Sequence, residues 1–284
     1  PVPFDPSTSM LQRIFDADVA AGGDSYWIDR ILTRPAGGSG GNLLYTKGRA
    51  LYMYTHNPNT LGFAGQGTGA NQGGGGFAYR EAIQSGVTHL YTVTISGGGL
   101  SEQTAQRQNA PSHWRSVHTG SGLSVEQQKF ITHNNVAVTI LNVTNTGAEP
   151  TTRTVTAATP SVVTQRVEGD ERTGSFTTRY DVTTVSTRFS GDGFTPSGDN
   201  LVRTVTIDPG ETVTLKLQLG AITEEIPESE AEYERYKGYD AETALATQLA
   251  EYNKWWVDNV PYIDVPDENV KKMSYYRTFL SRFN

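Results

Sequence analysis

The sequence predicts a mainly β protein, with a large antiparallel β-sandwich followed by helices. Glycine (30 residues), threonine and valine are abundant and the hydrophobic share is 36%, a composition that suits an all-β protein with much surface. Short runs of alternating apolar and polar residues recur up to residue 222, separated by Gly, Asn and Pro turns. From residue 228 the apolar residues recur every three or four positions, which is typical of amphipathic helices.

The strand-like runs are steady from Val87 onward. Glu211–Leu219 alternates most regularly, with valine and leucine on one face and threonine, lysine and glutamine on the other, which predicts a sheet with one face in water. Asp208-Pro209-Gly210 predicts the turn before it. Further strands are expected in the runs Leu43–Thr55, His89–Ser96, Leu123–Thr132, Val136–Val143, Thr152–Ala158 and Leu201–Ile207.

Two irregular places fall within the β region. His133-Asn134-Asn135 has residues that tolerate the positive φ of a tight hairpin, so we expect a reversal there. Residues 178–189 change phase, because the apolar residues before Thr183 and after Thr184 fall on opposite faces. A β-bulge near these two threonines would explain the change.

Helices are expected after the acidic stretch Ile222–Glu230, around Ser229–Lys237 and Asp240–Trp256, with Asp240 as the N-cap of the second. In the second helix the stripe expected to be buried consists of Leu245, Leu249, Tyr252 and Trp256.

A third helix is expected over Pro266–Asn284, with Pro266 at its first position and acidic residues next to it at the positive end of the helix dipole. Its apolar stripe needs further helices to cover it, so we expect a helical domain that continues beyond Asn284. We therefore divide the chain into a sandwich (1–222), a helical linker (223–262) and the start of a further helical domain (263–284). The stripe consists of Val270, Met273, Tyr276, Leu280 and Phe283.

Composition excludes several functions. The net charge of −7 is spread without long runs, which argues against a nucleic-acid or anionic-membrane partner, and no apolar stretch is long enough to cross a bilayer. The absence of cysteine excludes disulfides, thiolate metal sites and a cysteine nucleophile. The five histidines show no metal spacing and no Gly-x-Ser-x-Gly motif occurs, so we expect no metal, no cofactor and no serine hydrolase. The start Pro1-Val2-Pro3-Phe4 looks like the end left by removal of a signal peptide, so we expect a secreted protein.

The glycine-dense stretch Gly62–Gly76 is the first candidate for ligand contact. It matches neither a Walker A loop nor a dinucleotide fingerprint. It is either a surface loop or a loop whose bare backbone approaches a ligand. Aromatic faces stack on sugars, while amides, guanidinium groups and carboxylates bind their hydroxyls. Side chains of these kinds in and after the stretch give the candidate sugar-binding residues Gln66, Asn71, Gln72, Phe77, Tyr79, Arg80 and Glu81.

Trp114 is a second candidate, either as a sugar platform or as a packed sandwich aromatic. Several segments around and after it, in their order, resemble the N-terminal sandwich, linker and first barrel helix of glycoside hydrolase family 63 and the mannosylglycerate-hydrolase-like group. These enzymes are inverting hydrolases with an (α/α)6 barrel of six helical hairpins. The segments are Trp114, Gly122-Leu123-Ser124-Val125, Lys129-Phe130-Ile131-Thr132, Val136-Ala137-Val138, Asn142-Val143-Thr144-Asn145-Thr146-Gly147, Asp208-Pro209-Gly210-Glu211-Thr212, Trp255-Trp256, Pro261-Tyr262-Ile263 and Pro266-Asp267.

The resemblance implies that a sandwich loop reaches over the barrel mouth and that both catalytic carboxylates lie after Asn284, so no catalytic residue is assigned here. We expect the N-terminal part of a secreted, inverting glycoside hydrolase that acts on an oligo- or polysaccharide. Its partner would be the C-terminal (α/α)6 part, within the same protein or as a separate chain. The alternative is a non-catalytic carbohydrate-binding or adhesion module. A lyase or phosphorylase on the same architecture is a third possibility.

Overall fold

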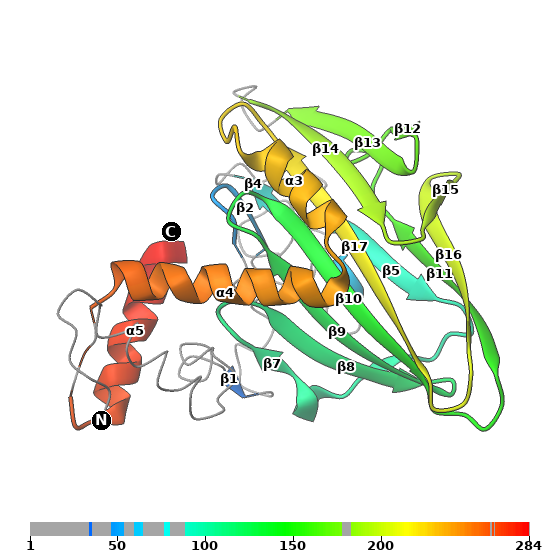
Figure 1. Cartoon of the computed structure of the whole chain (residues 1–284), viewed down its shortest axis with the longest axis horizontal. Coiled ribbons are helices and arrows are strands. Elements are labelled where there is room, and N and C mark those ends of the chain that lie inside the picture. The colour runs from blue at the N-terminus through cyan, green and yellow to red at the C-terminus, as the bar shows by residue number, and fades with distance from the viewer. Residues whose placement is uncertain are drawn as a thin grey trace.

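The computed structural model describes residues 34–35, 47–53, 60–64, 77–79, 89–177, 183–261, 263 and 265–283. Two antiparallel sheets form a sandwich, and three α-helices follow them in the chain (Figure 1). The predicted fold class, a β-sandwich followed by helices, is confirmed.

The larger sheet has ten strands in the order β1-β7-β8-β9-β10-β17-β14-β13-β12, with β6 paired to β8. The pairs β8–β9, β9–β10 and β13–β14 join strands that are consecutive in sequence, whereas β17 returns to lie between β10 and β14. The strands are β1 (Arg34–Pro35), β6 (Ser101–Glu102), β7 (Gln108–Asn109), β8 (Trp114–Gly120), β9 (Leu123–Ile131), β10 (Val136–Asn145), β12 (Arg166–Glu168), β13 (Glu171–Thr177), β14 (Thr184–Gly191) and β17 (Thr212–Ile222).

The smaller sheet has the order β15-β16-β11-β5-β3, and β2 and β4 form a separate pair. The five runs expected between His89 and Ile207 and the run Glu211–Leu219 are all strands, within a few residues at their ends. Asn135, with φ +68, makes the expected reversal between β9 and β10. The remaining strands are β2 (Leu51–Met53), β3 (Leu61–Ala64), β4 (Phe77–Tyr79), β5 (His89–Ile95), β11 (Thr151–Ala158), β15 (Thr195–Ser197) and β16 (Asn200–Ile207), and a short 3-10 helix, η1, covers Thr104–Gln106.

The bulge expected near Thr183–Thr184 is wrong. Strand β13 ends at Thr177, strand β14 begins at Thr184, and these two residues pair across the strands. From Thr184 onward β14 pairs with β13 in a regular register, whereas residues 178–182, on which the change of phase also rests, lie outside the described residues.

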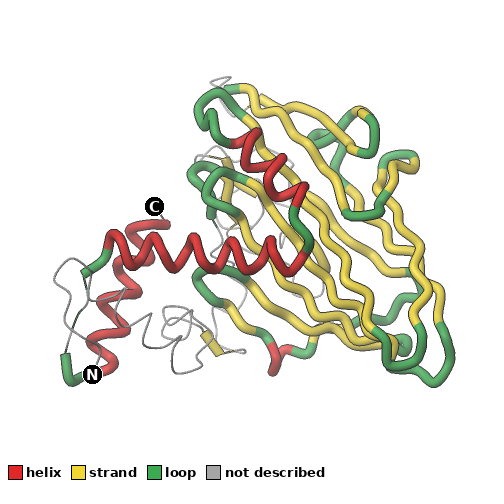
Figure 2. Tube along the Cα trace, in the orientation of Figure 1, coloured by secondary structure: helices red, strands yellow, loops and turns green. Residues whose placement is uncertain are grey.

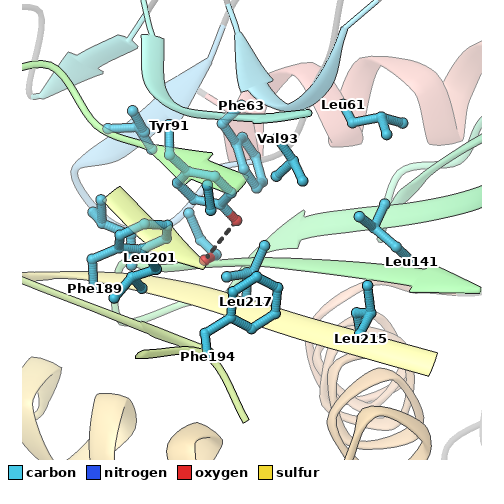
Figure 3. Close-up of a cluster of buried hydrophobic side chains, with 14 of the residues drawn as sticks. Leu61, Phe63, Tyr91, Val93, Leu141, Phe189, Phe194, Leu201, Leu215 and Leu217 are labelled. Carbon is cyan, nitrogen blue, oxygen red and sulfur yellow. Dashed lines mark hydrogen bonds between the residues drawn. The ribbon is translucent and has the colours of Figure 1, made fainter. Parts of the chain in front are cut away.

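The main core fills the space between the two sheets (Figure 3). Leu215, Leu217 and Leu219 of β17 point into it, as the alternation predicted. Within this core the ring of Tyr91 lies 4.8 Å from that of Phe189, and its hydroxyl is 2.7 Å from the Thr139 hydroxyl oxygen. Each fully buried large apolar side chain contributes about 1.5–3 kcal/mol, so this layer supplies most of the sandwich's stability.

The outer face of the large sheet is covered in part by α3 (Ser229–Gly238). Its Tyr233 and Tyr236 are fully buried against the sheet. The expectation that the polar face of β17 lies in water is therefore wrong in its second half, because Lys216 and Gln218 are buried. Lys216 Nζ donates to the Tyr236 carbonyl oxygen at 2.8 Å, so a polar side chain of the strand binds the C-terminal end of the helix.

A buried carboxylate also fastens α3 to the sheet. Glu171 of β13 accepts two hydrogen bonds from the Arg188 guanidinium, at 2.7 and 2.9 Å, and one from Lys237 of α3 at 2.6 Å. Burial opposes ionisation of Glu171, but the hydrogen bonds from these two cations outweigh it and hold its pKa below the ordinary value.

Helix α4 (Ala241–Asn259) extends from the large sheet to one side, and α5 (Glu268–Phe283) packs across its far end (Figures 1 and 2). Asp240 is the N-cap of α4, as predicted, and accepts from the Thr243 N–H at 2.7 Å. Leu249 and Trp256 of its expected stripe are buried, whereas Leu245 and Tyr252 are half-buried. Within the described part of the chain, no helix is both long and apolar enough to span a membrane.

The start of α5 differs from the expectation. Pro266 lies outside the helix, and Asp267 caps it by accepting from the Asn269 and Val270 N–H groups at 2.8 and 3.3 Å. The Asp267 side chain accepts hydrogen bonds from N–H groups that have no partner within the helix. The helix therefore begins after Asp267 and not at Pro266.

The face that α5 turns to α4 also differs from the predicted stripe. Tyr275 and Phe279 are buried, and the Tyr275 ring lies 6.3 Å from that of Trp256. Val270 and Met273, from the predicted stripe, are 42% and 51% exposed. Helix α5 therefore has two apolar faces, of which α4 covers one.

Candidate functional site

The structure describes three of the eight predicted sugar-binding residues. Phe77 and Tyr79 lie in β4, where they pair with Met53 and Leu51 of β2. Trp114 lies in β8. The structure thus places the first two on one short strand and Trp114 in the ten-stranded sheet. The other five predicted residues, Gln66, Asn71, Gln72, Arg80 and Glu81, lie outside the described residues.

Trp114 is buried in the sandwich. Its exposed fraction is 0%, it belongs to the main core, and the Arg107 guanidinium carbon lies 5.5 Å from its ring centroid. A ring enclosed in this way offers no face to a sugar. Its position matches the alternative interpretation of Trp114 as a packed sandwich aromatic.

The strand that carries Tyr79 is tied to the β9–β10 hairpin through its partner β2. The Asn135 side-chain oxygen accepts from the N–H groups of Ala50 and Leu51 at 3.1 and 3.0 Å. In the same segment, the Arg49 N–H donates to the His133 carbonyl oxygen at 2.7 Å. The position of the β2–β4 pair therefore depends on this hairpin turn.

A cluster of polar and charged side chains is buried beside Trp114. Arg107 donates to both carboxylate oxygens of Glu102, at 2.7 and 2.5 Å. The Ser116 hydroxyl is 3.1 Å from His118 Nε2 and accepts from Gln127 at 3.1 Å. Lys129 lies on the same inward face as Gln127 and is 0% exposed.

Burial and neighbouring charges shift the pKa values in this cluster. Burial lowers the pKa of Lys129 to about 7, against an opposing effect of the Glu102 carboxylate. Burial, together with the positive charges of Lys129 and Arg107, lowers the pKa of His118 to about 4. The imidazole is therefore neutral at pH 7.

Sequence reasoning missed this cluster, although a signal was present. In the run Leu123–Thr132, a period of two places Gln127 and Lys129 on the same face as Val125 and Ile131. Two polar side chains on an otherwise apolar face indicate buried hydrogen-bond partners.

A separate cleft of about 670 Å³ lies where β14 and β17 border the start of the helical region. Its described lining consists of hydroxyl and carboxylate groups and Ile222, with no aromatic ring to stack on a sugar. Glu224 and Glu225, from the acidic stretch Ile222–Glu230, line it and are exposed. The lining residues are Thr183, Thr184, Ser186, Ile222, Thr223, Glu224 and Glu225.

The buried carboxylates of the described residues are engaged in ion pairs. Glu102, Glu171 and Glu232 each bind an arginine side chain, at distances of 2.5 to 2.7 Å. Burial opposes ionisation of Glu171, but the hydrogen bonds from Arg188 and Lys237 hold its pKa below the ordinary value, so Glu171 is a poor proton donor. The described residues contain no group of three or more His, Asp or Glu side chains that could hold a metal ion.

No family model matches the sequence. Among solved structures, a putative kojibiose phosphorylase from the human microbiome is similar with a TM-score of 0.52 at 7% identity, over 79% of this chain and 37% of that chain. A family GH92 α-mannosidase from Bacteroides thetaiotaomicron gives a TM-score of 0.36 at 11% identity, over 84% of this chain and 38% of that one. The first similarity is one of fold, and the second is too distant to support an argument. The chain spans little more than a third of the length of these two proteins.

Proposed function

We propose that the chain is the N-terminal part of a secreted glycoside hydrolase of the inverting, (α/α)6-barrel kind, related to family 63. The observation that carries the proposal is the fold shared with the kojibiose phosphorylase, in which this sandwich and its helices correspond to about a third of a longer protein. The motif order from Trp114 to Asp267 supports the same proposal. One fold can carry several activities, so the test of this proposal covers several sugars.

The exposed apolar face of α5 supports a helical partner. Val270 and Met273 leave a stripe open beside the face that α4 covers. Packing against the other helices of a barrel would bury this stripe, as amphipathic helices require. In this proposal the sandwich supports the barrel, and the segment with Gln66, Asn71, Gln72, Phe77, Tyr79, Arg80 and Glu81 contributes to one edge of the substrate pocket.

A glycan panel tests the proposal. The complete protein would be incubated with kojibiose, nigerose, maltose, isomaltose, trehalose and mannobioses, and the product anomer would be followed by NMR. We expect hydrolysis with inversion at the anomeric carbon, since the acid and base of an inverting enzyme leave room for a water molecule between them. A retained anomer would contradict the inverting mechanism. Binding of a glycan without any turnover would favour the alternative, a carbohydrate-binding or adhesion module.

A glycoside phosphorylase is the second candidate, because the similar structure is described as a phosphorylase. The same panel repeated with inorganic phosphate separates the two. A hydrolase releases the free sugar at a rate that phosphate does not change. Formation of a sugar 1-phosphate that depends on added phosphate would identify a phosphorylase.

A further inference from the structure

Two side chains of β9, in the larger sheet, bind the backbone of Gly62 in β3 of the smaller sheet. Its N–H donates to Gln127 Oε1 at 2.7 Å, and its carbonyl oxygen accepts from Lys129 Nζ at 2.6 Å. Both side chains are buried, with exposed fractions of 1% and 0%. Because both backbone groups of one residue are bound, β3 cannot shift along its axis without losing two buried hydrogen bonds.

The surroundings of Gly62 keep these bonds in place. Gly62 has a φ of +84, and a β-carbon there would lie 2.8 Å from the Tyr91 carbonyl oxygen, so glycine is required. The amide of Gln127 is oriented by its second hydrogen bond, to Ser116. Lys129 Nζ also lies 5.5 Å from the ring centroid of Phe63, the next residue of β3.

The same hairpin holds the strand on the other side of the glycine-rich stretch. β3 ends at Ala64, immediately before residues 65–76, and β4 begins at Phe77, immediately after them. β4 pairs with β2, and Asn135 binds the first N–H of β2 and the one before it. Strand β9 and its turn thus hold the strands on both sides of this stretch, across more than 60 residues of sequence.

We infer that Lys129 and Gln127 are positioning residues, which fix the place of β3 through Gly62, directly before segment 65–81 in the chain. The kinetic consequence rests on the proposed function, because this segment carries the predicted sugar-binding residues. The structural consequence does not depend on that function and can be measured separately.

Lys129→Met in the complete protein tests the structural consequence, with Lys216→Met as the matched control. Both lysines are buried and both donate to backbone carbonyl oxygens, but Lys216 binds α3. Hydrogen–deuterium exchange would be measured for a peptide covering 60–64, which contains β3. We expect faster exchange there in Lys129→Met and not in Lys216→Met. Equal exchange in the two variants, or no change in Lys129→Met, would overturn the inference.

A second pair of variants keeps the inference testable if Lys129→Met does not fold. Gln127→Met loses the acceptor for the Gly62 N–H, whereas Gln127→Glu keeps an acceptor oxygen beside Lys129. We expect faster exchange at 60–64 in the first and rescue in the second. The same exchange rate in both variants would show that the side-chain acceptor does not position β3.

Kinetics on the panel sugar with the highest turnover then tests the link to function. We expect kcat/KM to fall about tenfold or more in Lys129→Met, mainly through KM, because a displacement of about 1 Å can cost that much. Lys216→Met should stay within about twofold of the parent. If exchange rises at 60–64 while kinetics are unchanged, the positioning role stands and the proposed role of segment 65–81 in sugar binding fails.

Discussion

Tyr79 and Arg80 are the residues on which the proposed role of the segment after β3 depends most directly. The strand that ends at Tyr79 is tied through β2 to the buried Asn135, so a substitution at its end is expected to leave the sandwich folded. We predict that Tyr79→Ala or Arg80→Ala in the complete protein lowers kcat/KM, by about tenfold for the loss of a stacking or charged contact worth 1–2 kcal/mol. Steady-state kinetics with circular dichroism as the folding check would measure this. Unchanged kinetics in both variants would remove the segment from the substrate pocket.

His118 makes the stability of the sandwich sensitive to acid. Its pKa is about 4 in the folded protein and 6.5 in a free histidine, so the unfolded chain binds more protons between these values. Its stabilising contribution is therefore complete above pH 6.5 and is lost as the pH falls towards 4. His113, whose pKa burial and Arg115 lower to about 4, acts in the same direction.

We predict that His118→Gln reduces the slope of unfolding free energy against pH between 4 and 6.5, by up to about 1.4 kcal/mol per pH unit. Glutamine keeps a polar group that can reach Ser116 but cannot take up a proton in this range. Urea unfolding at pH 4.5, 5.5 and 7 would measure the slope. A slope equal to that of the parent would mean that His118 is not protonated on unfolding in this range.

At the scale of the elements, the attachment of α3 depends on Glu171, whose carboxylate binds Arg188 and Lys237. Glu171→Gln keeps the shape of the side chain and removes its charge. Arg188 and Lys237 then lose their buried shared carboxylate and keep only exposed partners, Glu234 and Asp170. We predict a loss of about 2 kcal/mol in unfolding free energy, together with faster exchange of the α3 amides.

Glu168→Gln is the control for this prediction. Its ion pair with Arg166 is 3.3 Å long, with side chains 60% and 66% exposed. An exposed pair of this kind contributes little, so the cost should stay below about 0.5 kcal/mol. Similar losses in the two variants would contradict a specific role of Glu171 in docking the helix.

The sequence predicted elements better than it predicted which of their faces are buried. The alternation of Glu211–Leu219 gave the strand and its inner face correctly. It could not show that α3, which follows ten residues later, would cover Lys216 and Gln218. From the sequence alone Lys216 is predicted to be solvent-exposed, because the carbonyl oxygens that it binds belong to another element of the chain.

The candidate site was predicted only in part for the same reason. Residue types suited to sugars were visible in the stretch after Gly62, but the side chains that hold Gly62 lie more than 60 residues away in β9. Trp114 looked equally suited to stacking or packing, and only the arrangement of two sheets around it shows that it is enclosed. Contacts between distant segments therefore decide what local sequence leaves open.

At the scale of the whole molecule, the apolar residues of α5 indicate where a further part of a longer protein could pack against this chain. Tyr275 and Phe279 are buried, with the Tyr275 ring 6.3 Å from that of Trp256 in α4, whereas Val270 and Met273 are exposed. An isolated surface methionine needs no explanation, but two exposed apolar residues on adjacent turns of one helix suit contact with a further element. The proposed barrel would supply that element.

Met273→Ala distinguishes a stripe buried in the complete protein from one that stays in water. We predict a loss of about 2–5 kcal/mol in unfolding free energy in the complete protein, as for a buried methionine, and less than about 0.5 kcal/mol in residues 1–284 alone. Lys272→Ala, one residue away and exposed, should have little effect in either. Denaturant unfolding of both forms would measure these differences. A cost below 0.5 kcal/mol for Met273→Ala in the complete protein would show that this face stays solvated, and the helical partner would then have to contact the chain elsewhere.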